Sequence, residues 1–427
     1  MPTPPSAAAR ADAPAAATRR APVGAVLAGL VVVAALVTSV LLFVRHPDPL
    51  VALLPSPDMY ELHVDFDTFR LSAVALTQGG DIYATPAKLP NLNPPLLSVL
   101  LLPFAWLDAL TGYRIFAVLM LLTTVGSVLA VARELRLRPL VQVGVVAVVL
   151  ASSPLHGTLL LGQIYPLLLA GLVAGWIAER RGRPVLAAVL YGVVVALKPS
   201  LAPVLLLAGA QRRWRPFAAG IAAAAGATLL GVLAAGPSSA VGWLRFALDT
   251  PAPDVPDNAS LPGMAARFGL PPSLGTLLGA AALVGTLVWC HRHRDRVDPA
   301  GTAPWAVLAA GLLMSPISWH NYSMLLWPGL LVLIALGRGA TAAAALAVAV
   351  VPVAWSAEWP PGTTGSALGR SLYCVVLLGY WLALLSSSRA PRPGVTSVPG
   401  STSVPDPVTV GAADGPSGST GSATVSS

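Results

Sequence analysis

Apolar runs long enough to cross a lipid bilayer recur along most of this chain, and no other feature restricts its fold so strongly. The first run covers residues 21–44 and the last covers residues 370–387. An α-helix needs ~20 apolar residues to span the hydrocarbon core. Only 10% of the residues are charged, against about 25% in soluble domains, and the mean hydropathy is +0.73. The sequence therefore predicts an all-α integral membrane protein with one multi-span domain over residues 21–387.

Arginine clusters separate the apolar runs and indicate which connections face the cytoplasm. They lie at residues 133–138, 180–183, 212–215, 292–296, 338 and 389–392. Cytoplasmic loops of membrane proteins are enriched in Lys and Arg. The net charge of +8 is explained by these loops, so we exclude nucleic acid as a partner. Cys290 and Cys374, the only cysteines, lie at or in apolar runs, so no disulfide or metal framework is expected.

The charge pattern predicts about twelve transmembrane helices with both termini in the cytoplasm. Residues 94–107 would add a crossing that places the arginines at 133–138 outside, so we predict a short re-entrant or interfacial segment there. Several runs are shorter than a full span and require tilted or broken helices. The crossings are predicted at residues 21–44, 115–131, 139–153, 158–177, 184–197, 199–210, 216–235, 273–290, 303–317, 320–336, 339–355 and 370–387.

The segments outside the spans are two termini and three outer loops. Residues 1–20 are rich in Ala, Pro and Arg, and residues 388–427 in Ser, Thr, Gly and Pro, so we predict a disordered cytoplasmic arm and a disordered cytoplasmic tail. The first span could also be a cleavable signal peptide, but its apolar run exceeds the ~7–15 residues usual for one. The outer loops are predicted at residues 45–93, 236–272 and 356–369.

An acidic segment, Val64-Asp65-Phe66-Asp67-Thr68-Phe69-Arg70, follows the first span closely. In a helix Asp65 and Phe69 would share one face. A carboxylate held at the membrane boundary by an aromatic neighbour can serve as a general base. The alternative is that Asp65 and Asp67 are solvated loop acids, which are common.

Three polar residues interrupt or border apolar runs. Gln163 must find a partner, which could be another helix or a ligand. Lys198 stands before Pro199 at a helix break, where it could bind an anionic ligand or extend toward the outer interface. His320 can donate to phosphate, whereas the adjacent Trp319 could belong to the interfacial aromatic belt.

Taken in order, these segments resemble glycosyltransferase family 87, the type C polyprenyl-phosphate-mannose-dependent α-mannosyltransferases of actinobacteria. The family usually has Tyr where Phe69 stands and an aromatic residue where Asn93 stands. The matching residues are Asp65, Phe66, Phe69, Arg70, Gly79, Gly80, Tyr83, Asn93–Leu96, Gly162, Gln163, Leu197–Pro199, Asn258, Ser260, Leu261, Gly263, Arg267 and Ser315–His320.

The resemblance implies a polytopic type C glycosyltransferase fold in the cell membrane, with the active site on the extracytoplasmic side. It implies a mannosyl or related donor on polyprenyl phosphate, a glycolipid or lipoglycan acceptor, and an inverting reaction with Asp65 as the base. We expect Lys198 and His320 to face the leaving phosphate, and Gln163, Arg70, Asn258 and Trp319 to complete the substrate-binding residues. No metal or other cofactor is expected. The alternatives are a polytopic transporter or lipid flippase, and a scaffold in which Asp65 is dispensable.

Overall fold

The structure is a computed structural model that describes residues 23–46, 55–249 and 252–388. In these ranges the regular elements are helices, and one isolated β-bridge pairs Asn258 with Trp319. The predicted arm at 1–20, and all but the first residue of the predicted tail at 388–427, lie outside the described ranges.

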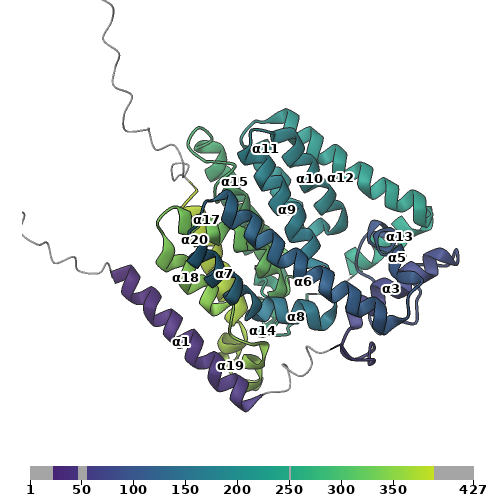
Figure 1. Cartoon of the computed structure of the whole chain (residues 1–427), viewed down its shortest axis with the longest axis horizontal. Coiled ribbons are helices and arrows are strands. Elements are labelled where there is room, and N and C mark those ends of the chain that lie inside the picture. The colour runs from purple at the N-terminus through teal and green to yellow at the C-terminus, as the bar shows by residue number, and fades with distance from the viewer. Residues whose placement is uncertain (1–22, 47–54, 250–251, 389–427) are drawn as a thin grey trace, which may run out of the picture. The chain divides into compact units, whose positions relative to one another are not determined.

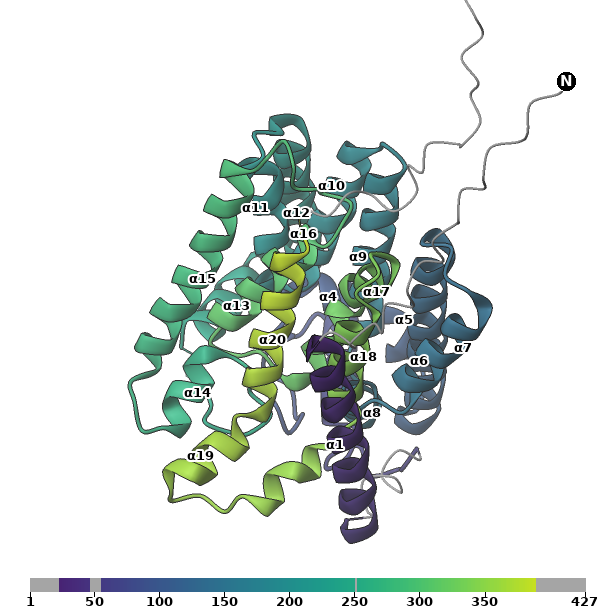
Figure 2. The same ribbon diagram turned by 90° about the vertical axis from the view of Figure 1, so that its left-hand side faces the viewer.

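Four of the described helices have the length and composition to cross a membrane, or up to six if each bent pair counts as one span. Figure 2 shows α15 and α20 inclined in the same way, whereas α1 slants the other way. The four are α1 (Val23–Arg45), α6 (Ala109–Glu134), α12 (Trp214–Ala235) and α15 (Pro272–Arg292), and the bent pairs are α7 (Pro139–Leu150) with α8 (Ser153–Leu161), and α19 (Thr364–Arg370) with α20 (Leu372–Ser386).

The remaining apolar helices are shorter, and in all of those named below except η2 and α18 a proline in the first turn explains the break. A proline suits the first turn of a helix but interrupts the interior of one. The predicted multi-span all-α fold with broken helices is confirmed, whereas the count of twelve spans stays a prediction. The shorter helices are α9 (Tyr165–Arg180), α10 (Pro184–Leu197), η1 (Pro199–Leu201), α11 (Pro203–Ala210), α16 (Ala303–Met314), η2 (His320–Leu326), α17 (Trp327–Ala335) and α18 (Gly339–Val348).

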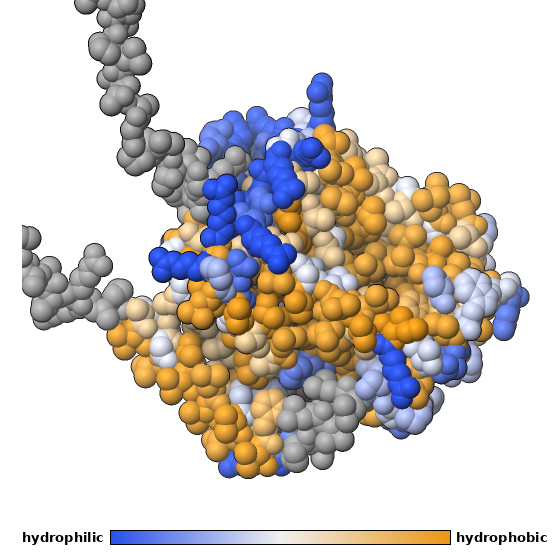
Figure 3. Space-filling view, in the orientation of Figure 1, coloured by the Kyte–Doolittle hydropathy of each residue, from blue (hydrophilic) through white to orange (hydrophobic). Residues whose placement is uncertain are grey.

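The core lies around α16 and α17, while the long helices turn apolar side chains outward. In α16 every residue from Ala303 to Leu313 is buried. By contrast, Leu230 of α12 and Leu277 of α15 are 65% and 67% exposed. Figure 3 shows such hydrophobic side chains over most of the visible face. Apolar exposure on this scale fits contact with lipid rather than with water.

Arginines gather at one end of the helices, which we call the arginine end (residues 133–138, 180–183, 212–215, 292–296 and 338). Arg181 pairs with Glu134 at 3.0 Å, and Arg213 pairs with Glu179. These contacts join the ends of α6 and α9 to each other and to Arg213, the N-cap residue of α12. Figure 3 shows a group of hydrophilic side chains near one edge of the molecule.

The opposite end, which we call the site end, lies near the start of α6. Arg70 donates to the Leu107 carbonyl just before α6, whereas Glu134 at the far end of α6 belongs to the arginine end. Figure 1 shows α3 and α5 side by side there. The short elements of the site end are α3 (Val64–Thr77), α4 (Pro95–Leu100), α5 (Leu102–Ala105), α13 (Pro237–Asp249), α14 (Leu261–Arg267) and η3 (Val353–Glu358).

Two helix boundaries at the site end bear on the topology. Residues 95–105 form α4 and α5, of six and four residues, which are too short to cross a membrane, in keeping with the predicted re-entrant segment. The predicted span at 158–177 has a different start, because α8 continues to Leu161 and α9 begins at Tyr165. Gly162 ends α8 in the left-handed conformation, with φ 77°, and this turn carries Gln163.

Candidate active site

Asp65 lies in the first turn of α3, and buried aromatic side chains hold that turn in place. Phe66 is 0% exposed and Phe69 is 3% exposed. The Phe66 ring packs against the rings of Phe104 and Phe116, with centroid distances of 5.9 and 5.1 Å. Buried aromatic rings contribute strongly to core stability, so the position of Asp65 is fixed by its neighbours.

Gly162 allows the turn between α8 and α9 to approach α3 closely. A Cβ atom at this position would lie 2.4 Å from the Phe66 Cβ, and φ is +77°. Only glycine meets both demands without strain. The approach brings Gln163 to Asp65, and its Nε2 donates to the Asp65 Oδ2 at 2.6 Å. The partner that Gln163 requires is therefore the candidate base itself.

The environment of Asp65 suits proton transfer. Burial raises the pKa of Asp65 to about 6, against the lowering effects of the Gln163 hydrogen bond and the positive charge of Lys198. Such a carboxylate is largely ionised at neutral pH yet basic enough to accept a proton, as a general base must be.

Lys198 follows the last residue of α10, where Pro199 prevents the helix from continuing. Its Nζ donates to the Asn93 Oδ1 at 3.0 Å and lies 5.8 Å from the centroid of the Tyr322 ring. In the described ranges the ion pairs within 4.0 Å do not include Lys198. Its neutral partners leave the ammonium available to an anionic ligand.

Asn93 is a site residue that the sequence did not identify as one. The Asn91 Oδ1 accepts from the Asn93 backbone N–H at 3.0 Å and from its Nδ2 at 3.3 Å. The Tyr83 hydroxyl donates to the Asn93 carbonyl at 3.0 Å, and Asn91 donates to Ser72 of α3. The same loop thus connects α3 to Lys198. The signal that could have revealed it is the Asn91-Leu92-Asn93 pattern directly before two prolines.

Lys198 lines a large cavity of about 1140 Å³. Trp319 and Tyr322 also line this cavity, and the Tyr322 ring lies 4.6 Å from that of Tyr165. Among the described residues, Lys198 is the one cation in a mostly apolar lining, and such a cavity suits an anionic amphiphile. The apolar lining comes from α10, α11, α12, α15 and α16 and includes Val195, Leu205, Leu206, Ile221, Leu229, Val232, Leu283 and Met314.

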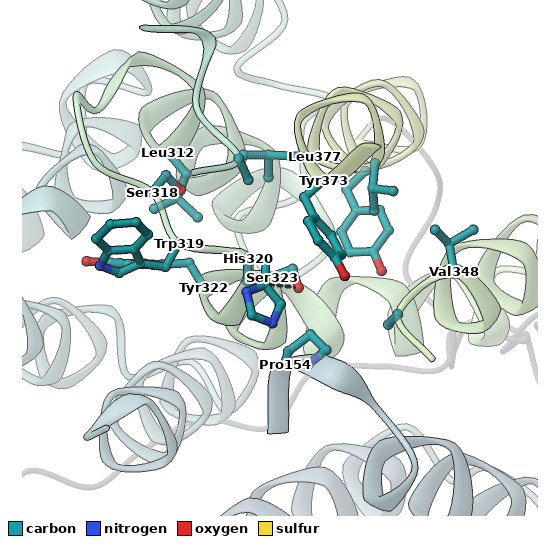
Figure 4. Close-up of a pocket in the computed structure, with 14 residues that line it drawn as sticks. Pro154, Leu312, Ser318, Trp319, His320, Tyr322, Ser323, Val348, Tyr373 and Leu377 are labelled. Carbon is teal, nitrogen blue, oxygen red and sulfur yellow. Dashed lines mark hydrogen bonds between the residues drawn. The ribbon is translucent and has the colours of Figure 1, made fainter. Parts of the chain in front are cut away.

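His320 lies apart from this cavity, whose lining in the described residues includes Trp319 but not His320. Its Nε2 is 3.3 Å from the Ser153 Oγ, and its ring centroid is 4.9 Å from that of Tyr373. It borders a second pocket of about 10 Å³, room for about one water molecule. Figure 4 shows the Trp319 ring pointing away from His320.

Asn258 and Arg70 join segments of backbone. The Asn258 Nδ2 donates to the carbonyls of Pro253 and Pro316, and its Oδ1 accepts from the backbone N–H of Ser260 and Ser318. Arg70 donates from Nε and Nη2 to the Leu107 carbonyl, at 3.2 and 2.9 Å.

Of the predicted site residues, the structure therefore brings together Asp65, Gln163 and Lys198, with Trp319 on the adjoining cavity wall. Arg70, Asn258 and His320 have protein partners elsewhere at the site end.

Fold and site together define a class of protein: a multi-span membrane enzyme with a partly buried carboxylate beside an apolar cavity that Lys198 lines. Comparison with known families narrows the class. Residues 91–316, more than half of the chain, match the sequence model of glycosyltransferase family 87. The chain belongs to glycosyltransferase family 87, as its motifs indicated, and this membership identifies it as a glycosyltransferase.

Two mycobacterial relatives carry the same name, polyprenol-phosphate-mannose-dependent alpha-(1-2)-phosphatidylinositol mannoside mannosyltransferase. The relative from Mycolicibacterium smegmatis is 26% identical over 309 residues, 64% of this chain and 70% of that protein. The relative from Mycobacterium tuberculosis is 27% identical over 325 residues, 69% of this chain and 76% of that protein. A crystal structure of ArnT from Cupriavidus metallidurans bound to undecaprenyl phosphate covers 82% of this chain and 77% of its own, with 16% identity and a TM-score of 0.42.

Proposed function

We propose that this enzyme transfers a mannosyl or related residue from a polyprenyl-phosphate-linked sugar to a lipid-anchored glycan. The observation that carries the proposal is the contact between Asp65 and Gln163, beside Lys198 and its cavity. The names of the two mycobacterial relatives support the same donor and a lipid acceptor.

The cavity is evidence for a lipid-linked donor. Its apolar walls suit a polyprenyl chain, and the chain would remain in a hydrocarbon environment throughout binding. Lys198 in the cavity lining suits the phosphate, because its described partners are the neutral groups of Asn93 and Tyr322. A charge-assisted hydrogen bond to phosphate is stronger than a bond to an amide.

The chemistry requires one base and one stabilised leaving group. Asp65 removes the proton of the acceptor hydroxyl as that oxygen forms a bond to the anomeric carbon. The bond between the anomeric carbon and the phosphate oxygen breaks, and its electron pair leaves on polyprenyl phosphate. Lys198 stabilises the charge that develops there. A single displacement of this kind inverts the anomeric centre.

The arginine end indicates which side of the membrane the site faces. Positively charged loops favour the cytoplasmic side, so the site end faces outward from the cytoplasmic membrane. Single cysteines in place of Asp81 and Arg136, both exposed, test this orientation. An impermeant thiol reagent applied to intact cells should label only the first, and labelling of the second alone would reverse the orientation.

A transfer assay tests the proposed function. Purified protein in lipid vesicles should transfer labelled sugar from polyprenyl-phosphate mannose to a phosphatidylinositol mannoside, with inverted anomeric configuration in the product. It should be inactive with a sugar nucleotide alone. Transfer from the nucleotide without the lipid donor would overturn the proposal, as would movement of the lipid donor across the vesicle membrane with no glycosidic product.

A further inference from the structure

We propose that His63 is a positioning residue for the reaction: it fixes the last turn of α8, and thereby holds Gln163 against Asp65. The inference rests on the proposed function, in which Asp65 acts as the base. His63 is the N-cap residue of α3 and is 0% exposed, so its imidazole lies inside the protein two residues before Asp65.

The two ring nitrogens of His63 have different partners. Its Nδ1 lies 2.7 Å from the Leu160 carbonyl, and its Nε2 lies 3.1 Å from the backbone N–H of Ser56. A carbonyl can only accept, and a backbone N–H can only donate. The neutral tautomer with its proton on Nδ1 satisfies both contacts, so the ring links segment 55–62 to the end of α8.

The α8 carbonyls that the side chains of His63 and Tyr113 contact lie in the last turn of that helix, where the regular helical donors run out. The Leu159 carbonyl accepts from the Tyr113 hydroxyl at 2.6 Å and also from the backbone N–H of Gly162 at 3.2 Å. His63 donates to the next carbonyl, that of Leu160. The His63 and Tyr113 rings are stacked, with centroids 3.6 Å apart. Together they satisfy two carbonyls of the last turn of α8.

This last turn leads directly into the contact with the base. The backbone N–H of Gln163 donates to the Thr158 carbonyl at 2.8 Å, so Gln163 is itself part of the helix ending. Gly162 lies against Phe66 with no space for a Cβ. The first turn of α3 therefore meets the α8–α9 turn through His63, Phe66 and Asp65, and a displaced Leu160 carbonyl moves Gln163 relative to Asp65.

Substitutions at His63 separate filling the space from donating the bond. His63→Leu fills much of the space but leaves the Leu160 carbonyl without its donor. His63→Asn places its amide near the Nδ1 position and can restore that donor, whereas His63→Gln extends toward the Nε2 position. We expect kcat to fall roughly tenfold in His63→Leu, with the donor KM within about twofold of normal. His63→Asn should recover most of the lost kcat, and His63→Gln should not.

His156 provides a matched control on α8 itself. Its Nε2 contacts the Leu150 carbonyl at 2.8 Å, so it makes the same kind of bond at the junction with α7. His156→Leu should leave kcat unchanged. Normal kcat in His63→Leu, equal losses in His63→Leu and His156→Leu, or equal activity of His63→Asn and His63→Gln would each overturn the positioning role. If His63→Leu fails to insert, the Asn and Gln variants still decide.

A double-mutant cycle between His63 and Gln163 tests whether the two act as one unit. If His63 acts through Gln163, His63→Leu should cost little further kcat in the Gln163→Leu background, because the positioned amide is already absent. Additive losses would contradict the inference. Failure of the proposed function is distinguishable, since it would appear as normal transfer in Asp65→Asn, whatever the result at His63.

Discussion

Two polar clusters at the site end differ in what their side chains contact. The proposed catalytic cluster consists of Asp65, Asn93, Gln163 and Lys198, and the loop cluster consists of Asn258, Arg267, His320 and Ser371. In the loop cluster, Arg267 donates to the carbonyls of Val255 and Asn258 at 2.7 and 3.0 Å, and to the Ser371 hydroxyl at 2.9 Å. Its charge serves to fix backbone.

The charged groups of the proposed catalytic cluster have neutral side chains as hydrogen-bond partners. Asp65 accepts from the Gln163 amide and Lys198 donates to the Asn93 amide, beside the cavity that Lys198 lines. A charged side chain whose hydrogen-bond partners are neutral is stabilised most when it binds a ligand of opposite charge or, for a carboxylate, when it accepts a proton. Residues of both clusters belong to segments that match the family motifs. A motif match alone therefore does not distinguish residues that contact substrate from residues that fix the surrounding backbone.

The largest expected effect distinguishes Asp65 from Asp67, two acids in the first turn of α3. Asp65→Asn should lower kcat about 10³-fold, because it removes only the proton-accepting oxygen. Expression and membrane insertion should remain normal. The measurement is transfer of labelled sugar from the lipid donor by purified protein. Asp67→Asn should cause a milder loss, and the reverse ranking of the two variants would move the base to Asp67.

Lys198 and His320 test the comparison directly. Lys198→Ala should raise the donor KM by ~10–100-fold, since a hydrogen bond to a charged group contributes about 1.5–3 kcal/mol. It should also lower kcat, because the ammonium stabilises the developing charge of the leaving group, and it should leave the acceptor KM unchanged. His320→Ala should lower the Tm without a selective effect on the donor. KM values for both substrates, with Tm from thermal unfolding in detergent, check this. A selective rise of the donor KM in His320→Ala would instead show that His320 binds the donor phosphate.

A pair of glycines tests the close approach of α3 to the α8–α9 turn. Gly162→Ala should lower kcat roughly tenfold, because the added methyl displaces the turn that carries Gln163. Gly182→Ala is the matched control: φ is +73° there, but nothing lies within 4 Å of the added Cβ. Both variants carry the backbone strain of alanine at positive φ, so equal activity losses would show that strain alone is responsible.

The smallest expected effect is a change in pH profile. As the proposed base, Asp65 must be ionised to accept a proton, and burial raises its pKa to about 6, so kcat/KM should fall as the pH drops through that value. Gln163→Leu removes a hydrogen bond that lowers the pKa, so the acidic limb should move to higher pH. Asn258→Ala, in the loop cluster, should leave the profile unchanged. An unshifted limb in Gln163→Leu would mean that another group titrates.

The sequence predicted the class of fold because its signal is strong and local. Apolar runs and arginine clusters follow from the cost of placing charges in hydrocarbon, and they indicated a helical membrane protein with breaks such as that at Lys198. Helix boundaries were less accessible. The junction at residues 158–165 reads as one apolar run, yet Gly162 ends α8 there, because the close approach of Phe66 is a tertiary contact.

The candidate site was partly predictable for the same reason. A buried amide and a lysine at membrane depth are costly without partners, which drew attention to Gln163 and Lys198 before their contacts were known. His320 is also buried, but whether it borders the large cavity or Ser153 depends on how η2 packs against α8. Asn93 gave little signal, because an asparagine beside prolines is usual in loops.

The neutral partner of Lys198 also has a consequence for turnover. The lipid donor is a phosphodiester with one negative charge, whereas the lipid left after transfer is a phosphomonoester, which carries about −1.5 to −2 at neutral pH. Asn93 offers no negative charge to compete with it for the ammonium. If Lys198 binds the donor phosphate as proposed, the same ammonium binds the product lipid more tightly, and that product should inhibit the enzyme in competition with the donor.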